Sequence, residues 1–396
     1  MVAALSTLDS PPLTEPELEW VTGPLERLLS PGPLGSLRVA DYLRHVNGLA
    51  SMLEREASSA DHVLNLCENR YRFLVLLGAA AARGMPCLLP PSRAPNVVGE
   101  MLTRYRGAIA VGDDAFSDGV KLERVPERYV SLPSELPVGS PERLHVPADQ
   151  LAVIGFTSGS SGPPKPQAKH WGDFCLSTRR NLELLARYCG GQSAHALATV
   201  PPQHMYGMET SVLMPLRGDI SIHQGRPFFP ADIAATLHSL PEPRVLITTP
   251  VHLKTLLNSE LPLPPISIIL SATAPLDQAL AARAERTTGA RVLEVFGSTE
   301  TCVIGHRRTA IENDWKRHPE VRLDSDEQGT WVRTPWLREP VLLHDRMQFD
   351  DDSSFRLLGR CSDHLEIAGK RASLGEINRR LLALPGVQDA VAFVPD

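Results

Sequence analysis

The chain has 396 residues, which is long enough to bury more than one core. Its net charge is −6 and it has no basic stripe, so nucleic acid is not a favoured partner. Its 6 cysteines are scattered without a C-x-x-C pair, which predicts reduced thiols in the cytoplasm and neither a disulfide framework nor a zinc site. The most apolar stretch, residues 73–82, is too short to span a bilayer, and the N-terminus lacks a signal-peptide pattern.

Apolar spacing predicts alternating helices and strands in both halves of the chain. Before residue 110 the predicted elements are helix 39–57, strand 61–66, helix 71–83, strand 87–89 and helix 94–105. A polar, loop-rich stretch over residues 113–141 separates them from the second half. There the predicted elements are helix 171–188, strands 197–200 and 245–248, helix 252–258, strand 266–270, helix 276–288 and strand 291–295. This alternation indicates parallel sheets covered on both faces.

The region from residue 320 to 358 has a different character. Short apolar runs alternate with polar turns there, such as the turn at residues 324–329. This pattern predicts a small antiparallel barrel or sheet, set apart from the parallel sheets before it.

The ten residues from Phe156 to Lys165 form the most informative motif of the chain. Glycines let backbone N–H groups turn toward an anion, hydroxyls add donors, and a lysine adds a mobile positive charge. The motif therefore predicts a phosphate-binding loop made of Thr157, Ser158, Gly159, Ser160, Ser161, Gly162 and Lys165. It is not a Walker A loop, because Pro164 stands where that motif needs glycine, and the dinucleotide fingerprint G-x-G-x-x-G is absent.

Five further motifs follow this loop in a fixed order along the chain. They are residues 201–207 (PPQHMYG), 271–276 (SATAPL), 295–301 (VFGSTET), 358–363 (LGRCSD) and 369–377 (GKRASLGEI). Together with the loop they resemble the adenylate-forming superfamily of acyl-CoA synthetases and AMP-dependent ligases, over roughly residues 61–396. One departure is Pro166, which replaces the glycine that usually ends the loop motif.

Three segments resemble a subgroup of this superfamily more closely. Residues 63–70, 84–92 and 204–209 are similar to the short AMP-dependent ligases of aryl polyene and xanthomonadin-type pigment clusters. This resemblance implies a role in pigment biosynthesis, with a small aryl acid such as a hydroxybenzoate as substrate. The activated acid would pass to a thiol, either of an acyl carrier protein or of CoA.

The resemblance also implies an α/β fold with three parts. A large N-terminal domain, residues 1–361, would hold stacked parallel sheets with helices over residues 39–319 and a small β-barrel-like subdomain over residues 320–361. Residues 362–396 would begin an α+β lid domain after a hinge at Ser362. The family's late catalytic lysine has no counterpart, because no lysine follows Lys370. We therefore expect an incomplete lid and a shortened form of a longer enzyme.

An adenylating enzyme joins a carboxylate to the α-phosphate of ATP and releases pyrophosphate, so it must neutralise a polyanion. The resemblance assigns the β- and γ-phosphates to the loop and Lys165, and a phosphate hydrogen bond to Thr299. Glu300 would bind Mg²⁺, a hard cation that prefers carboxylate oxygen. The alternative for Glu300 is a carboxylate at the start of a helix.

The same resemblance assigns the nucleoside and the acid. The adenine would contact Thr273, Ala274, Pro275, Glu294, Val295 and Phe296, mainly through backbone groups and the Phe296 ring. Asp345 would contact the ribose, and the alternative is a strand-end turn residue. Arg360 would contact the ribose or a phosphate, and the alternative is a surface ion pair. The acid would contact His204, Tyr206, Gly207, Met208, Gly297, Ser298 and Ile304. His204 would guard the carboxylate, and the alternative is a structural histidine.

Two rivals to the aryl acid ligase stay open. One is an acyl-CoA ligase for a non-aryl acid. The other is a catalytically disabled protein that binds nucleotide or acid, which is favoured if the late lysine is genuinely missing.

Overall fold

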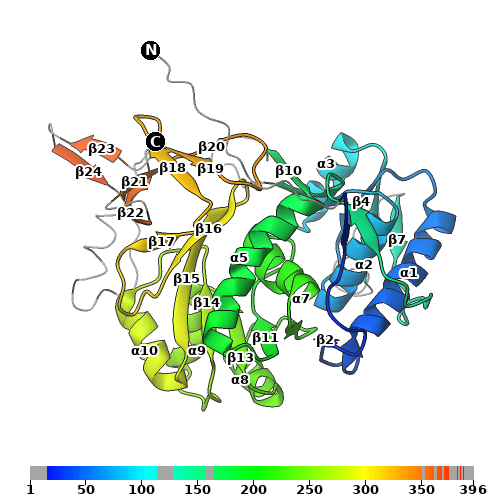
Figure 1. Ribbon diagram of the computed structural model, residues 1–396, viewed down its shortest axis with the longest axis horizontal. Helices are drawn as coiled ribbons and strands as arrows, with labels where there is room; N and C mark the ends of the chain where they lie inside the picture. The colour runs from blue at the N-terminus through cyan, green and yellow to red at the C-terminus, as the bar shows by residue number, and fades with distance from the viewer. Residues whose placement is uncertain are drawn as a thin grey trace. The chain divides into compact units, whose positions relative to one another are not determined.

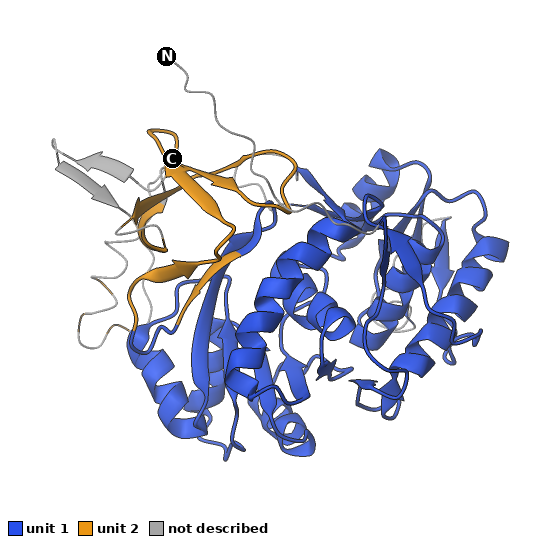
Figure 2. Cartoon of the chain, in the orientation of Figure 1, with its two compact units in different colours: residues 1–303, 308–311 blue, residues 304–307, 312–396 orange. Residues whose placement is uncertain are grey.

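The computed structural model describes residues 16–113, 128–156, 165–349, 353–360, 364–367 and 370–373, with Leu381, Leu384 and Val387. Figure 2 shows that the chain divides into two compact units. Unit 1 comprises residues 1–303 and 308–311, and unit 2 comprises residues 304–307 and 312–396. The predicted α/β fold with parallel sheets is confirmed.

The first sheet of unit 1 has the strand order β10-β9-β5-β4-β6-β7. Its strands are β10 (Pro166–His170), β9 (Leu151–Phe156), β5 (Cys87–Leu88), β4 (His62–Asn65), β6 (Ala108–Gly112) and β7 (Tyr129–Ser131). All neighbours are parallel except β10, which pairs antiparallel with β9. The sheet therefore has one hairpin, and the predicted phosphate loop lies in the connection that joins its two strands.

Three helices accompany this sheet: α1 (Val39–Glu56), α2 (Arg70–Ala82) and α3 (Pro95–Arg104). Helix α2 is apolar on all sides because it is buried along nearly its whole length. It packs closely on α1 at Gly78, where an added Cβ would lie 2.7 Å from the Tyr42 hydroxyl and 2.8 Å from Val46. The side chain of Asn69 begins α2 by accepting the backbone N–H of Arg72.

The second sheet of unit 1 has five parallel strands in the order β12-β11-β13-β14-β15. They are β12 (Ile220–Ile222), β11 (Ala194–Ala198), β13 (Arg244–Thr248), β14 (Ile268–Ser271) and β15 (Arg291–Ser298). Helices α8 (Pro230–Ser239), α9 (Pro250–Asn258) and α10 (Gln278–Thr288) pack on it through one cluster of buried aliphatic side chains. The predicted strand at 197–200 begins three residues earlier, and α8 was not predicted.

Helical segments lie between the two sheets of unit 1 (Figure 1). Helix α5 (Trp171–Cys189) contacts β10 of the first sheet and β14 of the second. A second helical run follows β11 and consists of α6 (Met205–Met208), the π-helix η1 (Glu209–Leu213) and α7 (Met214–Arg217). A π-helical turn is rare and is frequent at functional sites.

Two small ribbons complete the described part of unit 1. Strand β1 (Glu17–Glu19) pairs with β8 (His145–Pro147), and β2 (Leu28–Ser30) pairs with β3 (Leu37–Arg38). Within the described residues no helix is both long and apolar enough to cross a membrane.

Unit 2 is built from short antiparallel strands. They are the end of β16 (Cys302–Arg307), β17 (Trp315–Arg317), β18 (Arg322–Ser325), β19 (Thr330–Arg333), β20 (Val341–Leu343), β21 (Asp345–Phe349), β22 (Ser354–Arg360), β23 (His364–Ile367) and β24 (Lys370–Ser373). The unit begins before residue 320, the predicted start of the β subdomain. Of the predicted lid, the hairpin β23–β24 is described, and Ser362 lies outside the described residues.

Candidate active site

The predicted phosphate loop connects β9 to β10. Phe156, the last residue of β9, lies opposite Pro166, the first residue of β10. Residues 157–164, which include the six predicted loop contacts Thr157 to Gly162, lie outside the described residues. Lys165 is described and exposed. The two strands hold the ends of the connection together at the carboxyl end of β9, the edge where parallel sheets bind ligands.

Three of the sequence motifs meet beside this edge. A Cβ added to Gly155, one residue before the end of β9, would lie 3.3 Å from Thr299 Cγ2 and 3.4 Å from Met205 Cε. Thr299 follows β15, and Met205 follows His204 after β11. The structure therefore brings the predicted phosphate, metal and acid segments together, all within unit 1.

Glu300 lies in a tight turn between β15 and β16, covering residues 299–301. The turn is closed by a reciprocal pair of hydrogen bonds. The Ser298 N–H donates to the Thr301 hydroxyl at 3.1 Å, and the Thr301 N–H donates to the Ser298 hydroxyl at 3.2 Å. The alternative interpretation of Glu300 as a helix-start carboxylate is wrong, because the residue joins two strands. Its side chain is half-buried.

The turn also explains Gly297, a predicted acid contact. A Cβ on this residue would lie 2.1 Å from the carbonyl oxygen of Cys302, a distance that no side chain tolerates. Cys302 itself has a φ of 60°, which lies in the left-handed region that a non-glycine residue seldom adopts. The backbone folds back on itself here, and the Ser298 hydroxyl stabilises the turn by accepting the Thr301 N–H.

Two buried charged residues hold the turn from behind. The Lys169 ammonium on β10 donates to the carbonyl oxygen of Glu300. The Glu209 carboxylate on η1 accepts the N–H of Val303 at 3.0 and 3.2 Å from its two oxygens. Burial raises the pKa of Glu209 to about 7, against the opposing effects of the Val303 N–H, Lys169 and Asn181. Sequence reasoning assigned no role to either residue.

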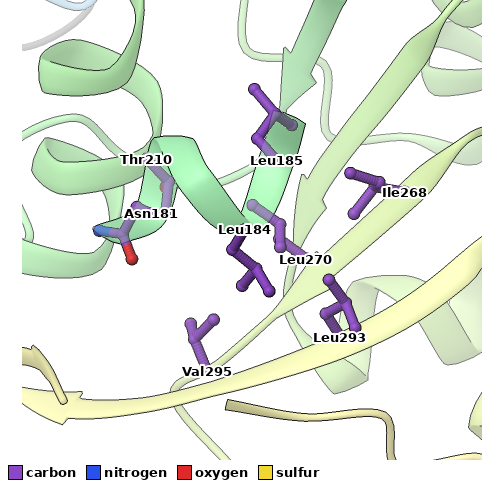
Figure 3. Close-up of a pocket in the computed structure, with 8 residues that line it drawn as sticks. All are labelled: Asn181, Leu184, Leu185, Thr210, Ile268, Leu270, Leu293 and Val295. Atoms are coloured by element: carbon purple, nitrogen blue, oxygen red, sulfur yellow. The ribbon is translucent and has the colours of Figure 1, made fainter. Parts of the chain in front are cut away.

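A small cavity of about 10 Å³ lies among residues of α5, η1, β14 and β15 (Figure 3). Asn181 of α5 and Thr210 of η1 are the polar residues of its lining, and Asn181 also reaches Glu209 at 3.4 Å. The remaining lining is aliphatic: Leu184, Leu185, Ile268, Leu270, Leu293 and Val295. This volume is about that of one water molecule, so the cavity is not the acid site.

The predicted acid segment begins α6. Partial burial lowers the pKa of His204, and the nearby guanidinium groups of Arg226 and Arg93 lower it further. The imidazole is therefore neutral at neutral pH. Burial raises the pKa of Tyr206, so its hydroxyl stays protonated. Gly207 is required by packing, because an added Cβ would lie 1.9 Å from the carbonyl oxygen of Pro201.

Two predicted acid contacts remain. Met208 is fully buried beneath this segment. Ile304 is buried as well and belongs to unit 2.

The predicted adenine residues occupy two adjacent segments of unit 1. Thr273, Ala274 and Pro275 are exposed after β14, and Thr273 has a φ of 79°. Glu294 braces this loop from β15: its carboxylate accepts the Leu276 N–H at 2.9 Å and the Thr309 hydroxyl at 2.8 Å. On β15, Val295 is buried and Phe296 is half-buried. The side chain of Glu294 thus stabilises the loop after β14.

Comparison with known proteins decides the family. Residues 35–323 match the family described as AMP-binding enzyme, which is more than half of the chain. The chain belongs to the AMP-binding enzyme family. It is 30% identical over 227 residues to a 4-coumarate–CoA ligase of Halorhodospira halophila, covering 57% of this chain and 55% of that ligase. It is 25% identical to a p-hydroxybenzoic acid–AMP ligase of Mycobacterium tuberculosis, covering 90% of this chain and 54% of the ligase.

The solved structure of ATP-bound MatB from Rhodopseudomonas palustris shares the fold with a TM-score of 0.76. The identity is 21%, and the match covers 92% of this chain and 82% of that protein. This AMP-binding chain spans about half the length of the two ligases above.

The predicted ribose contacts of this AMP-binding chain lie in unit 2. Asp345 and Arg360 are directly opposite each other on β21 and β22. The Thr330 hydroxyl fixes Asp345 by donating to its carbonyl oxygen at 2.8 Å. Two residues that are 15 positions apart in the sequence are therefore neighbours across the β21–β22 pair, and their contact with ribose stays a prediction.

The described residues include no group of three or more His, Cys, Asp or Glu that could hold a metal ion. Magnesium does not need such a group, because it binds through one or two carboxylates together with substrate phosphates. A single carboxylate at Glu300, beside the connection that carries the phosphate motif, fits that mode of binding.

Proposed function

We propose that this chain activates a carboxylic acid with ATP, forming an acyl-adenylate and releasing pyrophosphate, and then transfers the acyl group to a thiol. The observation that carries the proposal is the meeting of Thr299 and Met205 at Gly155, which joins the metal, acid and phosphate segments in unit 1. Membership of the AMP-binding enzyme family and the names of the two ligases support it.

In the proposed reaction a carboxylate oxygen attacks the α-phosphorus of ATP, and the bond from that phosphorus to the bridging oxygen of pyrophosphate breaks. Lys165 and the loop would hold the β- and γ-phosphates by charge-assisted hydrogen bonds. Mg²⁺, held by Glu300, would neutralise phosphate charge. Because His204 is neutral, it can donate a hydrogen bond to the carboxylate without protonating it.

The substrate we propose is a small aryl acid such as a hydroxybenzoate. The support is the resemblance of residues 204–209 to aryl acid ligases. The two ligases above are named for hydroxylated aryl acids. The thiol acceptor would be CoA or an acyl carrier protein, and a place in pigment biosynthesis rests on the resemblance to pigment-cluster ligases. The alternatives are a ligase for a non-aryl acid and a disabled binding protein.

The test is acid-dependent pyrophosphate release with a panel of benzoates and fatty acids. Lys165→Ala and Glu300→Ala should each lower the rate by at least about tenfold, about 1.4 kcal/mol, because each removes charge from the ATP site. The matched control is Lys254→Ala, a change at an exposed lysine of α9. Near-normal rates for both site variants would contradict the site assignment.

The acid panel also distinguishes the three candidate functions: aryl acid ligase, non-aryl acid ligase and disabled binding protein. A preference for hydroxybenzoates supports the aryl acid, whereas a clear preference for medium or long fatty acids overturns it. ATP binding without pyrophosphate release for any acid would favour the disabled binding protein.

A further inference from the structure

Two buried charged side chains contact the backbone at the Glu300 turn but come from other elements. Lys169 is 4% exposed on β10, and Glu209 is 1% exposed at the start of η1. Burial of a charge costs several kcal/mol unless the charge is compensated, so both groups are expensive to keep.

The partners of these two side chains bracket one short stretch of backbone. Lys169 donates to the carbonyl of Glu300, and Glu209 accepts the N–H of Val303 with both carboxylate oxygens. The Lys169 interaction is charge-assisted, which is the stronger class of hydrogen bond. The backbone from Glu300 to Val303 is therefore held by a donor on one side and an acceptor on the other. We call this pair the turn clamp.

The two members of the turn clamp come from the elements that carry the other predicted substrate segments. Lys169 lies four residues after Lys165, on the strand that leaves the phosphate loop. Glu209 directly follows Met208, the last residue of the predicted acid segment. The clamp thus fixes the Glu300 turn relative to both the phosphate and the acid segments.

We propose that Lys169 and Glu209 are positioning residues that hold the Glu300 carboxylate in place for a magnesium–ATP complex. This inference rests on the proposed function and goes beyond it, because neither residue touches the substrates in our assignment. A half-exposed carboxylate on a turn has several rotamers and a mobile backbone, and fixing its backbone removes part of the entropy lost on binding.

The test compares clamp variants with a matched control on α10 that holds the backbone of β15 in a similar way. Lys169→Met and Glu209→Met remove the charged groups while keeping side-chain length. Glu285→Met is the control, because Glu285 also accepts a backbone N–H, that of Val292 at 3.0 Å, and binds Arg308 at 2.6 Å. Lys169→Arg and Glu209→Gln keep a donor and an acceptor and serve as rescues.

Calorimetry measures ATP affinity with saturating Mg²⁺ and with EDTA. Both clamp variants should lose the Mg²⁺-dependent gain in affinity by at least about tenfold, while affinity in EDTA changes by less than about twofold. Amide hydrogen exchange of the peptide covering residues 298–303 should become faster in both. Glu285→Met should change neither quantity, and the rescues should restore most of the gain.

A double-mutant cycle with Glu300→Gln decides whether the clamp acts through Glu300. Lys169→Met should have little further effect on Mg²⁺-dependent affinity once Glu300 is changed, because residues that act as a unit are not additive. Independent, multiplying effects would overturn the proposal, as would clamp variants that behave like Glu285→Met. If Lys169→Met does not fold, the same cycle with Glu209→Met applies.

The outcomes separate this inference from the proposed function. Failure of the unchanged protein to release pyrophosphate with any acid, while Mg²⁺-dependent ATP binding still requires the clamp, would contradict the ligase activity alone. An unchanged Mg²⁺-dependent affinity in Glu300→Gln would overturn both the metal role of Glu300 and the clamp.

Discussion

Unit 1 contains two regions that are equally buried and chemically opposite. The apolar layer, beneath helices α8, α9 and α10, is a cluster of Leu, Ile, Val and Ala side chains. The polar seam lies between the two sheets and contains Arg70, Lys169, Asn181, Glu209 and Ser211, all buried. The layer needs only aliphatic contact to hold helices on a sheet. The seam uses directed hydrogen bonds because it must fix particular backbone segments.

Arg70 shows how the seam works. Its guanidinium donates to the carbonyl oxygens of Ala198 at 3.1 Å and Val200 at 2.8 Å, and to the Ser211 hydroxyl. Arg70 begins α2, which packs with the first sheet, whereas its carbonyl partners lie at the end of β11 in the second. Burial, and then the charge of Arg226, lowers the pKa of Arg70. The segment that leads to His204 is thereby tied to the other sheet.

The largest expected effect in this comparison is that of Arg70→Met. The change leaves two carbonyls and a hydroxyl without their buried donor, which should lower the free energy of unfolding by about 4 to 5 kcal/mol. Urea denaturation measures it, with Arg55→Met on the exposed face of α1 as the control, expected within about 0.5 kcal/mol. A loss below about 1 kcal/mol would show that the seam does not join the sheets.

A change in the apolar layer should affect stability without affecting the site. Leu237→Ala removes a fully buried side chain of α8 and should lower the free energy of unfolding by about 3 to 4 kcal/mol. The Mg²⁺-dependent ATP affinity of the folded protein should stay within about twofold of its normal value. A tenfold loss of affinity in this variant would remove the distinction between layer and seam.

The smallest effect, and the most specific to the seam, is a pH dependence from Glu209. The facing groups are the Lys169 ammonium, the Asn181 amide, the Val303 N–H and the Cys302 thiol. Because the folded-state pKa is raised from 4.5 to about 7, the unfolded state loses its proton first, and stability falls as pH rises from about 5 to 7. The shift corresponds to about 3 kcal/mol.

Glu209→Gln should remove this slope, so that its stability relative to the unchanged protein increases between pH 5 and pH 8 by about that amount. Thermal unfolding across this pH range, with Leu237→Ala as the control, measures it. Parallel pH profiles for the unchanged protein and Glu209→Gln would contradict a raised pKa at this position.

The two regions also differ in how far the sequence predicts them. The sequence predicted helices α1, α2 and α10 close to their observed bounds. Their buried faces are aliphatic, and the spacing of aliphatic residues is visible in the sequence. Strand β10 was missed, since its sequence, PQAKH, is polar and its pairing depends on β9. The π-helix η1 has no periodicity that separates it from an α-helix.

The motifs located the Glu300 turn and the two crowded glycines, because these features depend on residue type at fixed positions. They did not reveal the turn clamp, because a charged residue in a sequence is normally read as exposed. The one available signal was the position of Glu209 between two largely apolar stretches, residues 205–208 and 212–216. What the sequence could not supply was the partner of each charge, since Lys169 and Glu300 are 131 positions apart.

The account's central claim is that a carboxylate oxygen of the acid attacks the α-phosphorus of ATP in unit 1. A hydroxybenzoate labelled with ¹⁸O in both carboxylate oxygens, incubated with ATP, Mg²⁺ and pantetheine as the thiol, tests it directly by mass spectrometry of the nucleotide product. Thiol attack at the acyl carbon leaves the bridging oxygen on phosphorus, so the predicted product is AMP carrying one ¹⁸O atom, at a rate lowered at least about tenfold in Glu300→Ala. Unlabelled AMP, or ADP in its place, would contradict the account.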